Sequence, residues 1–322
     1  MSKIFYTDYY LPQKLIPVED YFNKNTGFKL PKGFDSYKNL YEFLKDKIGI
    51  KNISVIENKE NTCLDICTKL LDDFFTRTHV EPADISYFID DGDPLFTSAK
   101  EMNVLYYLLK KFGMNNASIL SIDEACSGHM SAIGLLSGTL NEKRKYAIFL
   151  AYSVTNYGNR FPFNAWVQGD GAGILVMNYQ SKGWKIVDFT SQSFGIKSFA
   201  IFHSKEPPMD LPFFVRTGIN LMKKFLSDNN ISIKDVYTII PQNIGFQSYT
   251  ALYPKVAKFP TEKYFTENYA SGGHMSTVDT IRNITDFFKK KSIPRNAYVL
   301  LYTATAQTRG ESHHYVLLQN NV

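Results

Sequence analysis

The chain has little cysteine, with three residues in a length of 322. An odd and low count argues against a disulfide-stapled secreted domain and favours a reducing compartment. The sequence has no apolar run of 18 residues, so we expect no membrane span. Its first residues, MSKIFYTDYYLPQK, hold no long apolar stretch after the lysine, which argues against a signal peptide. Together these absences predict a cytoplasmic location without a membrane partner.

Two further absences concern partners and domain organisation. No stripe of Lys and Arg interleaved with aromatic residues occurs, which argues against a nucleic-acid partner. No linker rich in Pro, Gly or Ser divides the chain, so its halves are expected to share one core. The formal charge of +5 is mild. It fits ordinary solubility, with a weaker preference for anionic partners such as coenzyme A phosphates or an acidic carrier protein.

An internal repeat is present. The tetrapeptide GHMS occurs at residues 128–131 and again at 273–276, an offset of 145. Asp84 and Asp235 each precede a short β-branched and aromatic run, and they are 151 residues apart. Two matches at nearly one offset indicate an internal duplication of roughly 150 residues. Each half reads as strand, helix, strand, helix, which predicts an α/β fold with helices packed on a mixed or parallel sheet.

The hydrophobic periodicity predicts the main elements. Helices are expected over 61–77, 98–113, 127–140 and 210–229, and strands over 117–125, 147–156, 168–179, 297–307 and 312–320, the first two of them buried. Cys63 and Cys67 lie four residues apart on the apolar stripe of the first helix, and packing is their expected role rather than a metal pair. His313 and His314 are adjacent on a strand, so at most one is expected to face inward.

Cys126 is the candidate nucleophile. It lies where a predicted buried strand meets a predicted helix, and Gly128 allows a tight turn behind it. The partial positive charge of a helix N-terminus stabilises a thiolate there, and the backbone N–H groups of the turn can hold an oxyanion. The alternative is a buried structural cysteine.

His274 occupies the corresponding turn of the second half. Equivalent turns of duplicated halves meet at the interface between the halves, so we expect His274 to lie near Cys126. A cysteine and a histidine are the minimal set for covalent acyl chemistry, in which one attacks and the other handles protons or polarises a carbonyl. His129, one turn into the first helix, is expected to point into packing or solvent.

Six segments now point to one family. They are YYLPQKLIPVEDY, DKIGIKN, IDEACSG, QGDGAGILVM, IIPQNIGFQ and GGHMSTVD. In order along the chain, they resemble the YLP, TGIRER, AACAG, FGDGAGA, PHQAN and GNTSA segments of thiolase-superfamily condensing enzymes, and β-ketoacyl-acyl-carrier-protein synthase III above all. The resemblance implies a thiolase-like fold of two duplicated βαβαβαββ halves in five α/β layers, here residues 1–180, with the nucleophile, and 181–322. It also implies a dimer.

The resemblance implies that Cys126 is the acylated cysteine. At the other two catalytic positions this sequence differs from synthase III. Gln242 stands where the family has a catalytic His after Pro, and His274 stands where synthase III has Asn, although synthases I and II have a second His there. The expected catalytic set is therefore Cys126, Gln242 and His274. Gln242 can donate through its amide N–H but cannot donate a charged hydrogen bond or relay a proton. A weaker donor costs about 1–3 kcal/mol, roughly 10- to 100-fold in rate, which favours a specialised enzyme over housekeeping fatty-acid initiation.

Two other family sites are altered. The segment TATAQTRG (303–310) stands where the family has a glycine loop that helps to form the oxyanion hole. Three of its side chains are expected to narrow or reshape that hole, namely those of Ala304, Thr305 and Ala306. Phe43 and Lys47 fall where the family uses Trp and Arg at the coenzyme A mouth. The resemblance therefore implies that Phe43 stacks on adenine and that Lys47 meets a phosphate.

The predicted function is that of an acyltransferase similar to 3-oxoacyl synthase III in fatty-acid, polyketide or other specialised biosynthesis. Cys126 is acylated from an acyl-CoA or acyl-carrier-protein thioester and passes the acyl group on, by decarboxylative condensation or by direct transfer to an amine or alcohol. The thioester is a substrate, and neither a cofactor nor a metal is expected. The expected partners are the thioester carrier and a second copy or a homologue, giving a homodimer or a heterodimer.

Two alternatives to the enzyme stay open. The first is a non-catalytic subunit that pairs with an active homologue, favoured by the loss of the His after Pro241 and of the glycine loop. The retained Cys126 argues against it, because such a subunit has no chemical need of a thiol in that turn. The second is an acyl-binding protein that only stores the thioester.

Overall fold

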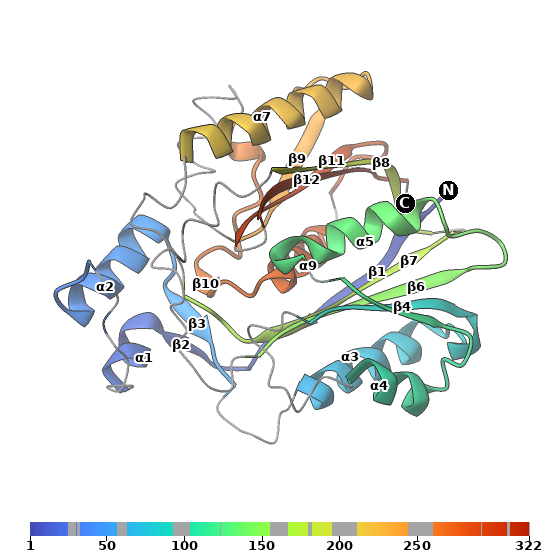
Figure 1. Cartoon of the computed structure of the whole chain (residues 1–322), viewed down its shortest axis with the longest axis horizontal. Helices are drawn as coiled ribbons and strands as arrows, with labels where there is room; N and C mark the ends of the chain where they lie inside the picture. The colour runs from blue at the N-terminus through green and yellow to red at the C-terminus, as the bar shows by residue number, and fades with distance from the viewer. Residues whose placement is uncertain are drawn as a thin grey trace.

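Figure 1 shows the course of the chain in a computed structural model. The structure describes residues 1–24, 30, 33–56, 63–92, 104–122, 124–154, 167–179, 182–194, 211–243, 260–290, 292–307 and 310–321. The α-helices are α1 (Val18–Lys24), α2 (Tyr37–Phe43), α3 (Cys63–Thr78), α4 (Val104–Phe112), α5 (Gly128–Ser137), α7 (Leu211–Asp228) and α9 (Thr277–Phe288). The strands are β1 (Lys3–Tyr10), β2 (Leu15–Pro17), β3 (Asn52–Ser54), β4 (Ile85–Gly92), β5 (Ser118–Ser121), β6 (Tyr146–Ser153), β7 (Gly171–Asn178), β8 (Trp184–Phe194), β9 (Val236–Pro241), β10 (Ser271–Gly272), β11 (Tyr298–Gln307) and β12 (Gly310–Gln319).

The large sheet repeats one topology on either side of its middle. Its strand order is β5-β4-β6-β7-β1-β8-β12-β11-β9. Outward from the middle, β1, β7 and β6 pair antiparallel and β6 pairs parallel with β4. On the other side, β8, β12 and β11 pair antiparallel and β11 pairs parallel with β9. The halves join where β1 pairs with β8 through Lys3 and Ile4. The repeated order and directions confirm the predicted duplication.

The elements stack in five layers (Figure 1). Helix α7 covers the half-sheet that ends in β9, and α3 and α4 cover the half-sheet that contains β4 and β6. Between the two half-sheets lie α5 and α9, whose apolar side chains meet strands of both halves in one cluster. This middle layer includes Met130, Ile133, Leu136, Val278, Ile281 and Ile284, all at most 1% exposed. Burial of both central helices holds their N-terminal ends in fixed positions, which is what positions the site.

Most predicted elements are confirmed. The helices expected over 61–77, 127–140 and 210–229 correspond to α3, α5 and α7, and α4 covers the described part of 98–113. The strands expected over 147–156, 168–179, 297–307 and 312–320 correspond to β6, β7, β11 and β12. Helix α3 buries Cys63 and Cys67 completely, so packing is confirmed as their environment. In the described part of the chain, no group of three His, Cys, Asp or Glu residues could hold a metal ion.

The prediction of a buried strand over 117–125 is wrong. Strand β5 has only four residues, three of them exposed, and it forms the outer edge of the large sheet. An edge strand has a neighbouring strand on one side only, whereas strands such as β6 have one on each side. The sequence ASIL does not show whether its strand lies at the edge or in the middle of the sheet.

The expectation that at most one of His313 and His314 faces inward is also wrong, because both side chains are 0% exposed. Their side chains do point to opposite faces of β12, as alternation requires. One face is covered from α7, where the ring of Phe214 lies 4.3 Å from that of His313. The other face meets the middle layer, where Glu124 lies 3.4 Å from His314. A sheet covered on both faces buries both positions.

The GHMS copies are not structurally equivalent, although the elements beside them are. Strands β4 and β9 begin 151 residues apart, and helices α5 and α9 begin 149 apart. The offset of 145 between the tetrapeptides differs from both. The first copy forms the first turn of α5, whereas the second copy lies just before α9.

The predicted boundary between residues 180 and 181 falls on residues outside the described part of the chain, and it stays a prediction. No helix within the described ranges is long and apolar enough to span a membrane.

Candidate active site

Cys126 lies in a short 3₁₀ turn, Ala125–Ser127, that runs directly into α5. Its side chain is 4% exposed. The first residue of α5 is Gly128, and a Cβ atom there would lie 2.5 Å from the carboxyl carbon of Asp91 at the end of β4. Glycine is therefore required by this close approach, which brings the nucleophile turn against the sheet. The sulfur lies at a helix N-terminus, where the helix dipole favours a thiolate.

His274 meets Cys126 as predicted, with its Nε2 atom 3.2 Å from the sulfur. The histidine comes from the segment before α9 and is 3% exposed. Its backbone is held on both sides: its N–H donates to the carbonyl of Val167 at 2.8 Å, and its carbonyl accepts from the N–H of Gly169 at 3.0 Å. The ring therefore has a fixed position beside the thiol.

Asp279, in the first turn of α9, completes a triad that the sequence analysis missed. Its Oδ2 atom lies 2.5 Å from Nδ1 of His274. The same carboxylate accepts from the backbone N–H of Met275 at 3.0 Å and of Asn243 at 3.3 Å. A carboxylate on Nδ1 fixes the ring so that Nε2 faces the sulfur. The signal was present, since GGHMSTVD places an acid five residues after the histidine.

The charges around His274 favour its protonated form. Burial opposes the charge, but the Cys126 thiolate and the Asp279 carboxylate outweigh burial and raise the pKa of His274 to about 10. An imidazolium 3.2 Å from sulfur stabilises a thiolate. The geometry therefore holds an imidazolium between the sulfur of Cys126 and the carboxylate of Asp279.

Ser276 is held in a strained backbone conformation between His274 and α9. Its φ of 55° and ψ of −133° lie in a region that residues with a side chain rarely adopt. Its hydroxyl is buried and has no hydrogen-bond partner in the described part of the chain. Such strain is found at functional sites that the surrounding structure over-determines.

Gln242 lies close to the triad but contacts a different group. Its Nε2 atom donates to the carbonyl of Ala304 at 2.6 Å, and the side chain is 2% exposed. Thr305, the next residue of β11, has its hydroxyl 3.1 Å from that of Ser127, which follows the nucleophile. Thr305 thus contacts the nucleophile turn directly, and Gln242 reaches the neighbouring residue of the same strand, Ala304. The backbone of Ala306 continues β11, and the direction of its side chain lies outside the described part.

Phe43 and Lys47 lie apart from these residues. Phe43 ends α2, and its ring packs edge-on against Phe34 at 5.3 Å. Lys47 is exposed in the π-helical turn Leu44–Ile48 that follows. Figure 1 shows α2 at the periphery, away from α5 and α9. The contacts with coenzyme A that were predicted for Phe43 and Lys47 remain predictions.

His129 is packed, as expected. It is 0% exposed with its ring 6.4 Å from Phe149, and neither ring nitrogen has a hydrogen-bond partner among the described residues. Burial, with His314 nearby, lowers the pKa of His129 to about 3. The described contacts of His129 are therefore those of a packed ring in the middle layer.

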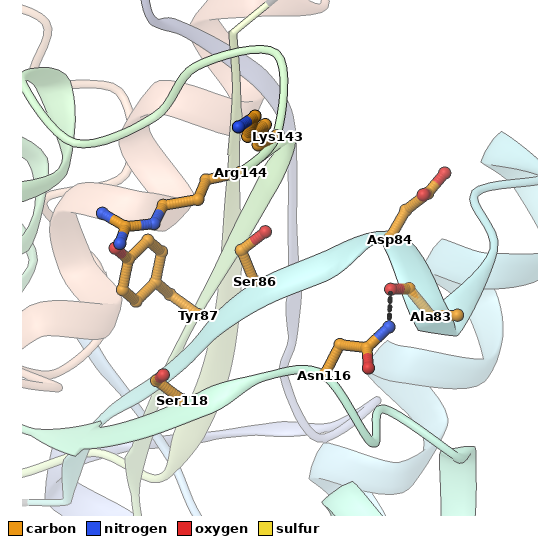
Figure 2. Close-up of a pocket in the computed structure, with 8 residues that line it drawn as sticks. All are labelled: Ala83, Asp84, Ser86, Tyr87, Asn116, Ser118, Lys143 and Arg144. Atoms are coloured by element: carbon orange, nitrogen blue, oxygen red, sulfur yellow. Dashed lines mark hydrogen bonds between the residues drawn. The ribbon is translucent and has the colours of Figure 1, made fainter.

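A polar pocket of about 310 Å³ lies elsewhere, at the start of β4 (Figure 2). Its lining includes Ser86, Asn116 and Arg144. A strand rises about 3.3 Å per residue, so the five steps from Ser86 to Asp91 span about 16 Å. Because Asp91 lies against the nucleophile turn, this pocket is remote from the triad.

Comparison with known proteins supports the resemblance. No family model matches the chain. A curated relative, β-ketoacyl-[acyl-carrier-protein] synthase III 2 of Staphylococcus epidermidis, is 20% identical over 283 residues, which are 81% of this chain and 85% of the relative. The solved structure of ChlB3, described as an acyltransferase, has a TM-score of 0.80 at 14% identity and covers 100% of this chain and 98% of its own.

A second solved structure, 3-oxoacyl-[acyl-carrier-protein] synthase III of Aquifex aeolicus, has a TM-score of 0.76 at 18% identity, covering 99% of this chain and all of its own. These findings confirm the predicted thiolase-like fold, in agreement with the five layers and the repeated sheet topology. They also confirm the predicted resemblance to β-ketoacyl-acyl-carrier-protein synthase III.

Proposed function

We propose that this chain, which has the thiolase-like fold and resembles β-ketoacyl synthase III, transfers an acyl group from a thioester, through Cys126, directly to a nucleophilic acceptor. The observation that carries the proposal is the triad: Cys126 sulfur 3.2 Å from Nε2 of His274, and Nδ1 of His274 2.5 Å from Asp279. The same order of nucleophile, imidazole and carboxylate serves direct acyl transfer in other folds.

The first step acylates the cysteine. The thiolate of Cys126 attacks the thioester carbonyl, a new C–S bond forms, and the bond to the donor sulfur breaks. The departing donor thiolate takes a proton from the imidazolium of His274, whose pKa of about 10 keeps it charged until then. A donor thiol leaves, and the acyl-enzyme holds a neutral imidazole.

The second step uses that neutral imidazole as a base. An acceptor O–H or N–H gives its proton to Nε2 of His274 while its oxygen or nitrogen attacks the Cys126 thioester. The bond to sulfur breaks, and the thiolate leaves beside the new imidazolium. The starting ion pair is restored without any other proton donor, so the triad suffices for a complete cycle.

Direct transfer fits these residues better than decarboxylative condensation. Condensation forms an enolate, whose oxygen needs two hydrogen-bond donors. The nitrogen of Gln242 gives one of its two N–H groups to Ala304 at 2.6 Å, which leaves one neutral donor on this side chain. A base and one acceptor molecule are enough for transfer. The resemblance in fold to ChlB3, described as an acyltransferase, supports the same reading.

The expected donors are acyl-CoA and acyl-carrier-protein thioesters, the substrate classes implied by the resemblance to synthase III. A dimer is proposed on the same ground. The edge strand β5 exposes Leu120 at 36%, and α4, which precedes it, exposes Tyr106 and Tyr107 at 65% and 53%. An exposed apolar strand edge is a natural surface for a second chain. The mass of the protein by light scattering, with and without Leu120→Lys, tests this proposal.

The function is tested by intact-protein mass. Wild type and Cys126→Ala are incubated with acetyl-CoA, longer acyl-CoAs and acyl-carrier proteins. We expect a gain of one acyl group on wild type only, followed by its loss when acceptors are added. A folded wild type that gains no mass from any donor contradicts the proposal and turns the question to a non-catalytic partner subunit.

A further inference from the structure

The amide of Gln242 has a chemically fixed orientation. Its partner is the backbone carbonyl of Ala304, 2.6 Å away, and a carbonyl only accepts hydrogen bonds. The atom facing that carbonyl must therefore be the nitrogen, which leaves the amide oxygen directed elsewhere. In the described part of the chain this oxygen is buried and has no hydrogen-bond partner.

The neighbours of this amide contact both ends of the triad. On one side, Ala304 is followed by Thr305, whose hydroxyl lies 3.1 Å from that of Ser127, next to the nucleophile. On the other side, the residue after Gln242 donates its backbone N–H to Asp279, the carboxylate that orients His274. Gln242 is therefore connected to both ends of the triad, through Ala304 and Thr305 on one side and through Asn243 on the other.

A buried hydrogen-bond acceptor without a partner is unfavourable by about 1–3 kcal/mol. An enolate oxygen cannot satisfy it, because both groups are acceptors. A molecule that brings an N–H or O–H does satisfy it. This oxygen is therefore matched to the incoming nucleophile and not to an oxyanion.

We infer that Gln242 selects a primary amine as the acyl acceptor, so that the product is an amide; this rests on the transfer function proposed above. A neutral primary amine carries two N–H groups. One proton goes to Nε2 of His274 as nitrogen attacks, and the other N–H donates to the Gln242 oxygen. The C–N bond forms, the C–S bond to Cys126 breaks, and thiolate and imidazolium are regenerated.

Alcohols and secondary amines cannot make both contacts. Each has one proton on the attacking atom, and that proton must go to His274. The Gln242 oxygen then stays unpaired in the transition state. Water has two O–H groups and meets both requirements, so slow hydrolysis is the expected background in the absence of an amine.

The test follows discharge of the acyl-enzyme by matched probes. Protein acylated on Cys126 is freed of donor and mixed with benzylamine, N-methylbenzylamine or benzyl alcohol, and with propylamine, N-methylpropylamine or propanol. Amines are compared at equal concentrations of the unprotonated form. Mass spectrometry gives the rate of acyl loss above that in buffer alone and identifies the product.

We expect the primary amine of at least one trio to discharge wild type about 10- to 100-fold faster than its two partners, the range set by one unsatisfied buried acceptor. Gln242→Leu should lose this preference, so that the primary amine discharges the acyl-enzyme no faster than its two partners do. Gln242→Glu should keep it, because a neutral carboxyl donates to Ala304 and retains an acceptor oxygen. Acylation of Cys126 in each variant shows that its site is folded.

Several results overturn the inference. They are equal rates for the three members of both trios, discharge by water alone, and a primary-amine preference that survives in Gln242→Leu. If malonyl-CoA discharges the acyl-enzyme and gives a product with a new carbon–carbon bond, while no amine does so, both the inference and direct transfer are wrong. If Cys126 takes no acyl group from any donor, the proposed function itself is wrong. This result is distinguishable from failure of the inference, because it is seen before the acceptor is added.

Discussion

At the residue scale, Ser276 stores strain beside the base. Its φ of 55° suits glycine, and strain of this kind costs about 1–3 kcal/mol. Glycine itself loses about 0.5–1 kcal/mol of backbone entropy on folding. We therefore expect Ser276→Gly to raise the free energy of unfolding in urea by about 1 kcal/mol. Because the relaxed turn no longer fixes His274, acylation of Cys126 should become slower.

Ser276→Ala separates the effect of the strained backbone from that of the buried hydroxyl. Alanine keeps the strained conformation and removes only the buried, unpartnered oxygen. If it stabilises the protein as much as Ser276→Gly does, the gain comes from the hydroxyl and the explanation by strain is wrong.

Asp279 governs the charge of His274, so Asp279→Asn should lower the pKa of that imidazole. The carboxylate is one of the groups that raise it to about 10. We expect slower acylation, by up to about 10⁴-fold, the loss seen when a triad Asp becomes Asn. The pH at which acylation falls off on the alkaline side should shift downward.

The control for this variant is Asp228→Asn, which removes an exposed carboxylate at the end of α7. Rapid-quench acylation measured from pH 6 to 10 compares the two variants with wild type. An unchanged rate and profile in Asp279→Asn is inconsistent with the triad.

The residues of the site differ in how far the sequence could predict them. Cys126 and His274 could be paired because a duplicated fold brings equivalent turns together, and this pairing held at 3.2 Å. Asp279 was missed because an Asp in the first turn of a helix also reads as an ordinary dipole-favoured residue. The Gln242 contact with Ala304 could not be predicted, because it depends on how β9 and β11 pair, 62 residues apart.

At the scale of elements, α5 depends on a close approach to the sheet. A Cβ atom on Gly134 would lie 2.4 Å from the ring of Phe189 in β8. Alanine favours the helix by about 1 kcal/mol, but overpacking of this kind costs about 1–3 kcal/mol. We therefore expect Gly134→Ala to lower the free energy of unfolding by up to about 2 kcal/mol in urea titrations.

Gly138 at the end of the same helix gives a matched control. A Cβ atom there meets nothing within 4 Å, and its φ of −91° suits alanine. Gly138→Ala should be neutral or slightly stabilising. Equal destabilisation by the two substitutions would mean that the contact with Phe189 is not the cause.

The two halves also show that a repeated tetrapeptide can reveal a duplicated fold without aligning equivalent residues. The offset of 151 between β4 and β9 agrees with that of 149 between α5 and α9. The GHMS offset of 145 does not, because one copy lies inside its helix and the other before it. The duplication was therefore correctly inferred, whereas the literal match pointed to positions with different roles.

At the scale of the whole molecule, five layers bury three neutral histidines. Burial lowers the pKa of His129 to about 3 and those of His313 and His314 to about 4, from about 6.5 in the unfolded chain. The unfolded state then binds more protons below pH 6.5. Their contribution to stability is therefore complete above about 6.5 and is lost as the pH falls toward 4.

Other groups act with different signs. The pKa of His274, raised to about 10, gives a contribution that is complete below 6.5 and lost as the pH rises to about 10. Burial raises the pKa values of Asp90 and Glu124, so these carboxyls favour the folded state as acid protonates them. The pH dependence of the total free energy of unfolding therefore combines contributions of opposite sign. The difference between a variant and wild type measures one of these contributions more directly.

His129→Leu isolates one of these terms, because it removes a single buried imidazole from the middle layer. The free energy of unfolding is measured in urea from pH 7.5 to 4.5. Below about pH 6 the slope against pH should be shallower than in wild type by up to one proton, or about 1.4 kcal/mol per pH unit. His79→Asn, which removes an exposed histidine, should keep the wild-type slope. Parallel curves for wild type and His129→Leu would show that His129 is not the buried neutral group that the fold requires it to be.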